Sequence, residues 1–196
     1  MKFKLFKFEK VTSTNDIAIN LIKDQNKQAG CIYAKIQSKG RGTYGRKWAS
    51  YKGNLFLSIF FPLKNNYPSF SEFSLINPLI ISSVIGHFCK KENINLKFPN
   101  DILVNRKKIC GILQEVITAN SQKFLIIGIG MNITTNPGIN KKYKATNILL
   151  QTKKKPKIEK IIDLIISSYV KFFADLKSYN YIKFKKKADL MALKQV

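Results

Sequence analysis

The sequence predicts an α+β domain in which helices cover a mixed, mainly antiparallel sheet. Short segments rich in Ile, Leu and Phe, of strand length, alternate with longer segments whose apolar residues recur at helical spacing. Segments 102–104, 109–117 and 123–133 are separated by turn-forming residues at 105–107 and 119–121, which favours antiparallel pairing. With 196 residues and 45% hydrophobic content, the chain is expected to fold as a single domain around one continuous core.

The N-terminal segment is predicted to be a strand followed by a helix. Residues 3–8 interleave Phe and Leu with lysine, as expected of a half-buried strand that runs up to Val11. Ser13 precedes Asp16 by three positions, which resembles a capping box at the start of a helix. The apolar residues that then repeat at helical spacing are Ile17, Ala18, Leu21 and Ile22.

Two further strands and two helices complete the predicted elements. Residues 31–37 and 55–61 are predicted strands because β-branched and aromatic residues are frequent in them. Residues 71–91 are predicted to form an apolar helix in which Pro78 marks either a kink or the first turn. A final long helix is expected after Pro156. Its apolar stripe consists of Ile158, Ile161, Ile162, Ile165, Tyr169, Phe172, Phe173 and Leu176.

The chain is strongly basic, with a formal net charge of +24 from 35 Lys and Arg against 11 Asp and Glu. Such a balance is typical of proteins that bind nucleic acid or another polyanion. The lysines, however, are spread over almost every segment beside abundant Ile and Asn, so an AT-rich genome is a sufficient explanation. The runs 153–155 and 185–187 flank predicted helices, where lysine normally forms a solvated face. We therefore expect no specific nucleic-acid partner.

Several other classes of protein are disfavoured. No apolar run approaches the roughly 20 residues that span a bilayer, and the N-terminus carries charges where a signal peptide is apolar, so we expect a cytoplasmic protein without membrane attachment. The three cysteines, Cys31, Cys89 and Cys110, show no metal-ligand or redox spacing, and His87 is the only histidine. Zinc chemistry and Ser-His-Asp chemistry are therefore not expected.

The segment from Gln37 to Trp48 has the composition of an anion-binding loop. Its glycines allow positive φ and close approach of backbone N–H groups to an anion, its cations add charge, and an indole face can stack on a base. The glycines are Gly40, Gly42 and Gly45, and the cations are Arg41, Arg46 and Lys47. The alternative interpretation is a flexible basic surface hairpin, and the loop by itself does not separate the two.

Two more segments could carry chemistry. In Lys97-Phe98-Pro99-Asn100-Asp101, a rigid corner holds Asn100 and Asp101 where a carboxylate could bind Mg²⁺ or take a proton, and Lys108 could reach a reacting phosphate. The alternative is a hairpin corner that caps its own backbone. In 128–133, two glycines within an apolar strand imply close approach of a ligand or backbone, and Asn132 could then bind a phosphate or ribose. The alternative is a bulge packed under a helix.

Taken together and in this order, these segments resemble the catalytic domain of biotin protein ligases across nearly the whole chain. The matching motifs are Ser13-Thr14-Asn15 after the first strand, Gln37, the Gly-Arg-Gly loop that ends in Arg46-Lys47-Trp48, a Lys-Trp-Pro-Asn-Asp box with Phe98 in place of Trp, Lys108, and Gly130-Met131-Asn132. The resemblance implies the biotin ligase fold, more distantly similar to class II aminoacyl-tRNA synthetases. It also implies a two-step reaction that forms biotinyl-5'-AMP from biotin and ATP with Mg²⁺ and then transfers biotin to a lysine of the biotin carboxyl carrier protein of acetyl-CoA carboxylase.

The resemblance also assigns roles to residues. The implied catalytic residues are Lys108, Arg41 and Asp101, with Asp101 as the candidate Mg²⁺ ligand. The implied biotin-binding residues are Ser13, Thr14, Asn15, Gln37, Gly40, Arg41, Gly42, Thr43, Lys108 and Gly111. The implied ATP-binding residues are Arg41, Thr43, Arg46, Trp48, Asn100, Lys108 and Asn132. Neutral partners such as Ser13, Thr14 and Gln37 suit the ureido ring of biotin.

The chain also departs from the family pattern. Thr43 stands where many members have arginine, so we expect weaker retention of the adenylate. We expect residues 1–196 to be a single catalytic domain, with no preceding DNA-binding domain and with the small β-barrel that often follows absent or truncated. The sequence is compatible with a homodimer. Lipoate protein ligases, which share the fold and reaction type, carry an Arg-Arg-x-Ser-Gly-Gly-Gly-like loop and a His-Asp pair that this sequence lacks. A lipoate ligase and a basic nucleic-acid-binding module are the remaining alternatives.

Overall fold

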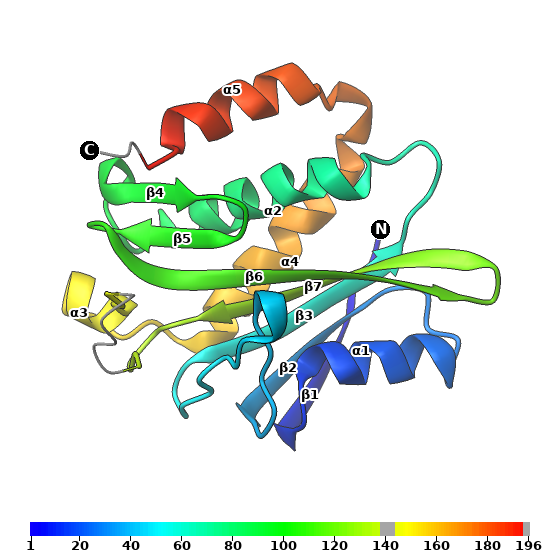
Figure 1. The fold of residues 1–196 in the computed structure, drawn as a ribbon, viewed down its shortest axis with the longest axis horizontal. Helices are drawn as coiled ribbons and strands as arrows, with labels where there is room; N and C mark the ends of the chain where they lie inside the picture. The colour runs from blue at the N-terminus through cyan, green and yellow to red at the C-terminus, as the bar shows by residue number, and fades with distance from the viewer. Residues whose placement is uncertain (138–143, 194–196) are drawn as a thin grey trace.

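A seven-stranded mixed sheet, in the order β1-β2-β3-β7-β6-β5-β4, runs through the centre of the molecule (Figure 1). The computed structural model describes residues 1–137 and 144–193. The strands are β1 (Lys4–Val11), β2 (Gly30–Gln37), β3 (Leu55–Pro62), β4 (Ile94–Lys97), β5 (Asp101–Val104), β6 (Lys107–Ala119) and β7 (Gln122–Met131). Strands β1 and β2 pair in parallel, and the other neighbouring pairs are antiparallel. The predicted mixed, mainly antiparallel sheet is therefore confirmed.

Helices cover both faces of this sheet (Figure 1). The helices are α1 (Thr14–Lys23), α2 (Phe70–Ile85), α3 (Ile148–Thr152), α4 (Ile158–Ala174) and α5 (Tyr181–Met191). Helix α1 packs on one face, where its buried residues join Ile32, Phe60 and Ile126 in one apolar cluster. Helices α2, α4 and α5 contribute to a larger cluster on the opposite face. No helix of the described ranges is both long and apolar enough to cross a bilayer.

Strand β3 shows how the sequence divides its side chains between these two faces. Leu57, Ile59 and Phe61 belong to the larger cluster, whereas Phe60 belongs to the cluster under α1. This alternation follows from the period of two along a strand. Ser58 shares the α1 face with Phe60, and its hydroxyl contacts the first turn of α1. The one polar position in this otherwise apolar strand therefore lies where β3 meets the first turn of α1.

The structure confirms the predicted hairpins. Residues Asn105 and Arg106 connect β5 to β6, and Asn120 and Ser121 connect β6 to β7, all four with positive φ. Such two-residue turns match the twist of antiparallel strands, and Asn tolerates this backbone conformation better than most residues. Local turn chemistry therefore sufficed to predict this part of the sheet.

Other predicted boundaries are wrong. The apolar helix begins at Phe70, where Ser69 and Glu72 form a capping box, so Pro78 lies inside α2 and does not mark its first turn. This helix ends at Ile85 and not at residue 91. The bounds of strand β4 were not predicted, because it is only four residues long, and helix α5 was not predicted, because lysines interrupt its apolar residues and only Ala188 is buried. Ser13 is the N-cap of α1, but its side chain makes no capping hydrogen bond, so the predicted capping box is absent.

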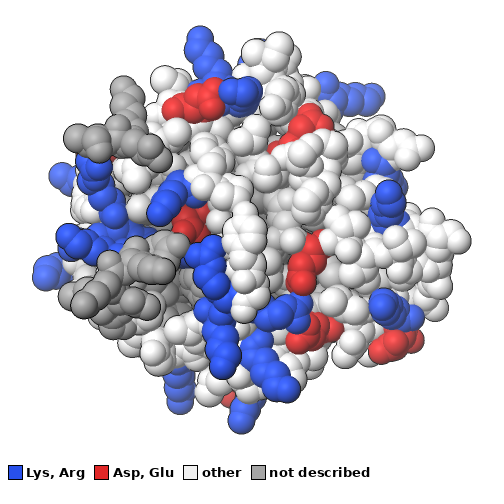
Figure 2. Space-filling model, viewed as in Figure 1, with Lys and Arg blue, Asp and Glu red and all other residues white. Residues whose placement is uncertain are grey.

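Basic side chains are dispersed over the molecular face shown in Figure 2, with acidic side chains between them. A protein that tracks a phosphate backbone usually gathers its Lys and Arg into a patch or stripe. The dispersed arrangement on this face is what a solvated lysine-rich surface looks like, so the net charge by itself carries no argument for a nucleic-acid site.

Candidate active site

A cavity of about 490 Å³ lies where the loop after β2, the start of α1, strands β6 and β7, and the corner between β4 and β5 meet. The site residues expected from the sequence line this cavity: Ser13, Thr14, Asn15, Gln37, Arg41, Gly42, Thr43, Arg46, Trp48, Asn100, Asp101, Lys108, Gly111 and Asn132. Gly40 lies behind the lining, where a Cβ atom would come 2.6 Å from the hydroxyl oxygen of Ser50. The three segments singled out in the sequence thus surround one space.

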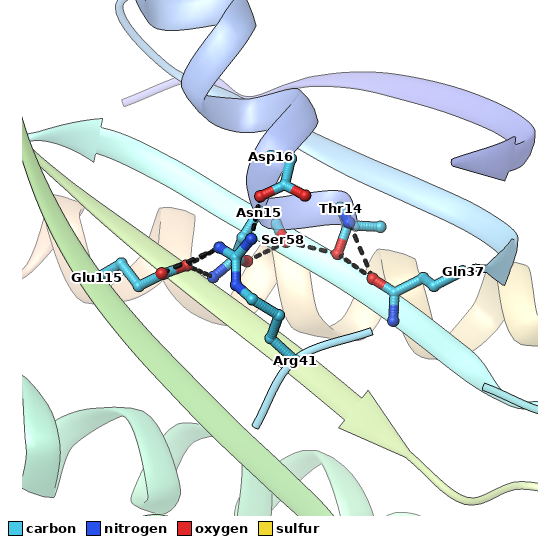
Figure 3. Close-up of polar contacts among 7 residues, drawn as sticks. All are labelled: Thr14, Asn15, Asp16, Gln37, Arg41, Ser58 and Glu115. Carbon is cyan, nitrogen blue, oxygen red and sulfur yellow. Dashed lines mark hydrogen bonds and ion pairs between the residues drawn. The ribbon is translucent and has the colours of Figure 1, made fainter. Parts of the chain in front are cut away.

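A cluster of neutral side chains contributes Thr14, Asn15 and Gln37 to the cavity lining, and Figure 3 shows its hydrogen bonds. The backbone N–H of Thr14 and its hydroxyl both donate to Gln37 Oε1, at 2.8 and 3.1 Å. Ser58 Oγ lies 2.7 Å from Thr14 Oγ1 and 2.5 Å from Asn15 Oδ1. Gly128 of β7 leaves room for this cluster, because a Cβ atom there would come 2.6 Å from Asn15 Oδ1. These buried groups can bind a ligand head that is polar but uncharged.

Arg41 extends from the loop beside this cluster and binds two carboxylates (Figure 3). Its Nη1 donates to Asp16 of α1, and its Nη2 donates to Glu115 Oε1 and Oε2 of β6, at 3.0 and 2.8 Å. Burial lowers the pKa of Arg41, but the hydrogen bonds to Asp16 and Glu115 more than offset this effect, so its pKa is raised. Glu115 also accepts from Asn15 Nδ2 at 2.6 Å.

Sequence reasoning missed Asp16, Glu115 and Ser58. Asp16 was assigned to a capping box, and the interpretation failed because its carboxylate turns to Arg41. Glu115 and Ser58 interrupt predicted apolar strands at positions where burial of a polar group requires a partner. A polar residue inside a strand is the signal that could have found both.

Lys108 and Asp101 form an ion pair in another part of the cavity. Lys108 Nζ lies 2.6 Å from Asp101 Oδ1, and the two side chains are 24% and 11% exposed. Backbone hydrogen bonds fix the start of β6 here, since Lys108 N donates to Lys144 O at 2.9 Å and Thr146 N donates to Lys108 O at 2.9 Å. Lys108 and Glu115 are seven positions apart on β6, a separation of about 23 Å at about 3.3 Å per residue. This strand contributes Lys108, Gly111, Ile112 and Leu113 to the lining, so the cavity runs from Lys108 toward Glu115 without reaching it.

The Trp48 indole lies over two glycines of the sheet. A Cβ atom at Gly111 would come 2.7 Å from Trp48 Cζ3, and one at Gly130 would overlap the five-membered ring. Lys108 Nζ lies 5.3 Å from the ring centroid. Trp48 Nε1 is buried and, within the described residues, has no hydrogen-bond partner. One part of the indole thus packs on backbone while the side chain still lines the cavity, a position that suits stacking of a base on its free surface.

The loop that carries Arg41 and Trp48 closes on itself. Gly42 N donates to Arg46 O at 2.6 Å, and Trp48 N donates to Gly40 O at 2.9 Å. Thr43 contacts the corner between β4 and β5, because Asn100 Nδ2 donates to its hydroxyl at 3.3 Å. These contacts bring the glycine loop and the Lys97–Asp101 corner together.

Asn132 was expected to bind ATP, and Asp101 was expected to bind Mg²⁺. Asn132 is buried, and its Nδ2 donates to Thr146 O at 3.0 Å, so this amide nitrogen orders the loop before α3. The described residues contain no group of three His, Cys, Asp or Glu side chains that could hold a metal ion. One carboxylate, that of Asp101, fits a Mg²⁺ ion whose remaining ligands are phosphate oxygens and water.

Comparison with known proteins identifies the family. Residues 5–132 match the model described as the biotin/lipoate A/B protein ligase family. The chain belongs to this family. Among its relatives, the bifunctional ligase/repressor BirA of Escherichia coli (strain K12) is 31% identical over 126 residues, which are 63% of this chain and 38% of that protein. The biotin–[acetyl-CoA-carboxylase] ligase of Paracoccus denitrificans is 25% identical over 175 residues, which are 86% of this chain and 72% of that protein.

A solved structure supports the same assignment. The biotin protein ligase of Leishmania major in complex with biotinyl-5-AMP superimposes with a TM-score of 0.82 and 27% sequence identity, covering 98% of this chain and 84% of that chain. The fold is therefore that of the catalytic part of biotin protein ligases. The chain spans well under half of the length of the Escherichia coli relative.

Proposed function

We propose that this chain is an ATP-dependent biotin protein ligase. It forms biotinyl-5'-AMP from biotin and ATP and transfers the biotinyl group to a lysine of a biotin carboxyl carrier protein. Family membership supports this proposal, as do the names of the relatives and the likeness to a structure that holds biotinyl-5-AMP. The family description also includes lipoate ligases, so the choice of biotin rests on the cavity itself.

The observation that carries the proposal is the division of the cavity into a neutral part and a cationic part. Thr14, Asn15 and Gln37 offer uncharged donors and acceptors, as a ureido ring requires. Lys108 lies farther along β6, where an acyl chain would place its carboxylate. Lipoate carries a dithiolane ring, which has no N–H or O–H donor and would cover the free lone pairs of the neutral part without pairing them, at a cost of about 1–3 kcal/mol per group.

In the proposed first step, a carboxylate oxygen of biotin attacks the α-phosphorus of ATP, and the bond to the pyrophosphate oxygen breaks. Negative charge concentrates on the phosphorus oxygens in the transition state, and the Lys108 ammonium and the Arg46 guanidinium stabilise it. Magnesium, when bound, neutralises part of the phosphate charge, and Asp101 is the carboxylate that would hold it. The Trp48 indole supplies a surface on which adenine stacks.

In the proposed second step, the neutral amine of a carrier lysine attacks the acyl carbonyl of the adenylate. The C–N amide bond forms, the C–O bond to AMP breaks, and the amine loses its proton. The loop over the cavity shields the anhydride from water until the carrier arrives. The acetyl-CoA carboxylase carrier is the proposed substrate because the Paracoccus denitrificans relative is named for that carrier's enzyme. We further propose that residues 1–196 act as one catalytic domain in the cytoplasm.

Exchange of labelled pyrophosphate into ATP tests the first step without a carrier. We expect exchange that depends on biotin and is not supported by lipoate at the same concentration. Mass spectrometry of a carrier domain incubated with the enzyme, biotin and ATP then tests the second step. Exchange that requires lipoate and ignores biotin would show that the ligase assignment is right and the substrate wrong, and no exchange with either acid would overturn the proposal.

A further inference from the structure

We propose that Asp16 and Glu115 are positioning residues that act through Arg41 and Asn15 to hold the neutral part of the cavity in the arrangement that receives the head group of the substrate. The inference rests on the proposed biotin ligase function. It assigns roles to two side chains that the sequence motifs did not single out.

The geometry around Arg41 supports the positioning role of the two carboxylates. Its guanidinium is held from two sides, by Asp16 at the start of α1 and by both carboxylate oxygens of Glu115 on β6 (Figure 3). The side chains of Arg41, Asp16 and Glu115 are 37%, 33% and 30% exposed, so all three are partly withdrawn from water. A planar guanidinium suits such a fork better than an ammonium would. The two carboxylates therefore tie the loop to a helix and to a strand at one point.

The net charge of Arg41 with its two carboxylates supports this role as well. Two carboxylates around one guanidinium leave this group with a net charge of about −1, which opposes the approach of another anion. An anionic ligand could bind Arg41 here only by displacing Asp16 or Glu115. The clamp thus reserves this part of the cavity for an uncharged head group and directs a carboxylate or phosphate toward Lys108. Orientation of the substrate follows from where the charges lie.

The direction of the hydrogen bonds in the neutral cluster also supports this role. An ionised carboxylate only accepts, so Glu115 fixes the amide of Asn15 with Nδ2 toward itself and Oδ1 toward Ser58. The Thr14 backbone N–H donates to Gln37 Oε1, so the single protons of the two hydroxyls suffice for the contacts of Ser58 with Asn15 and with Thr14. The oxygens of this cluster keep lone pairs that still accept hydrogen bonds. A neutral ring with N–H groups can donate to them, whereas a ring without N–H groups cannot.

The test measures the dissociation constants of biotin and of ATP separately by calorimetry, in the full chain and in Asp16→Asn and Glu115→Gln. Loss of a charge-assisted hydrogen bond predicts biotin binding weaker by about tenfold or more, with ATP binding changed by less than about twofold. Asp189→Asn removes a carboxylate of a solvent-exposed pair with Lys185 and serves as the matched control, with both constants unchanged. Equal weakening of both ligands, or unchanged biotin binding, would overturn the proposal.

A double-mutant comparison asks whether Asp16 acts through Arg41. In an Arg41→Ala background, Asp16→Asn is expected to have no further effect on biotin binding, whereas Glu115→Gln keeps part of its effect because Glu115 also orients Asn15. Additive losses for Asp16→Asn would show that it does not work through Arg41. If Glu115→Gln does not fold, Asp16→Asn still decides the matter.

Amide hydrogen exchange of residues 40–48 without ligand separates this proposal from the proposed function. Faster exchange in both single variants shows that the clamp holds the loop, whatever the substrate. If the wild-type chain binds no biotin, the ligase proposal fails, and loop exchange alone then decides whether Asp16 and Glu115 hold the loop through Arg41. If the wild type binds biotin and the variants bind it equally well, only the clamp is refuted.

Discussion

Two cations of the cavity are paired in opposite ways. Within the described residues, Lys108 forms its ion pair with Asp101, whereas Arg41 forms ion pairs with both Asp16 and Glu115. The first pair is neutral overall, so an anionic ligand can attract the ammonium without leaving a surplus of negative charge nearby. The second group is already negative and turns anions away. Equal numbers of positive charges in two parts of one cavity thus serve different purposes, because the carboxylates around them differ.

The comparison also explains why side-chain chemistry differs between the two parts. Lysine carries a compact charge on a flexible stem and can follow a phosphate as its charge develops, whereas the guanidinium of Arg41 is a rigid fork held in place by three acceptor oxygens. A flexible cation suits the reacting end, and a fixed one suits the end where a head group must be oriented.

The largest expected effect is that of Lys108→Ala on adenylate formation. Loss of one group that stabilises developing charge typically lowers the rate by about 10² to 10³. The variant also leaves Asp101 without this partner, at a cost of up to about 3–5 kcal/mol for a fully buried pair. We expect Lys108→Ala/Asp101→Asn to regain melting temperature but not pyrophosphate exchange. Exchange at the wild-type rate in Lys108→Ala would refute the catalytic role.

A smaller effect is expected from adding one methyl group at either of two glycines on β7. Gly130→Ala would push against the Trp48 indole, and Gly128→Ala would push against the Asn15 amide. Overpacking of this kind costs about 1–3 kcal/mol of stability. We expect Gly130→Ala to raise the KM for ATP and Gly128→Ala to raise the KM for biotin. Gly86→Ala, outside the cavity and next to a flexible lysine stem, is the control. The same KM change in both β7 variants would contradict the division.

The sequence was sufficient to predict most of the sheet and the membership of the site, for different physical reasons. The hairpins at Asn105 and Asn120 follow from local turn chemistry, and the strand of Leu55–Pro62 follows from an apolar run interrupted only by Ser58. The site residues were found because motifs far apart in sequence match one family. Strand β4 was not predictable, because its four residues pair with β5 and with Ala192 only in the folded chain.

The roles of Asp16 and Glu115 could not be predicted from the sequence, for a related reason. Asp16 stands at a position where a carboxylate favours a helix start whatever else it does, so its local pattern already had an explanation. Its partner Arg41 is 25 residues away, and Glu115 is 74 residues from Arg41. Only the tertiary structure brings one guanidinium between two carboxylates.

A further prediction concerns Trp48, the only tryptophan of the chain. If adenine stacks on the indole, biotin plus ATP should change its emission and its quenching by iodide, because a new ring shields it from water. Biotin without ATP should have the smaller effect, since its head group is proposed to bind beside Asn15. Emission and quenching that stay the same with both ligands would mean that the indole only packs on Gly111 and Gly130.

The smallest expected effect is on the loop itself. Residues 38–47 contain three glycines and four cations, a composition that repels itself and buries little until an anion arrives. We expect biotin plus ATP to slow tryptic cleavage in this loop severalfold, since Lys39, Arg41, Arg46 and Lys47 are potential cleavage sites. The clamp should make Arg41 the most protected of the four without ligand, and high salt should weaken that protection because the pair is partly exposed.

Thr43 limits how far this protection can go. Its hydroxyl accepts from Asn100, but it has no charge with which to hold a phosphate, so cleavage should persist at a reduced rate and some adenylate should escape. Thr43→Arg supplies the missing cation but also adds a tryptic site, so cutting is compared only at the four sites that both proteins share. At these sites cleavage should be slower in the variant when biotin and ATP are present, with little change in their absence, and adenylate release should be slower as well. Equal cutting of wild type with and without saturating ligands would show that the loop is not a lid over the adenylate. Equal cutting of wild type and Thr43→Arg under ligand would show that residue 43 does not govern closure, and would leave Arg41 and its two carboxylates as the contacts that hold the loop.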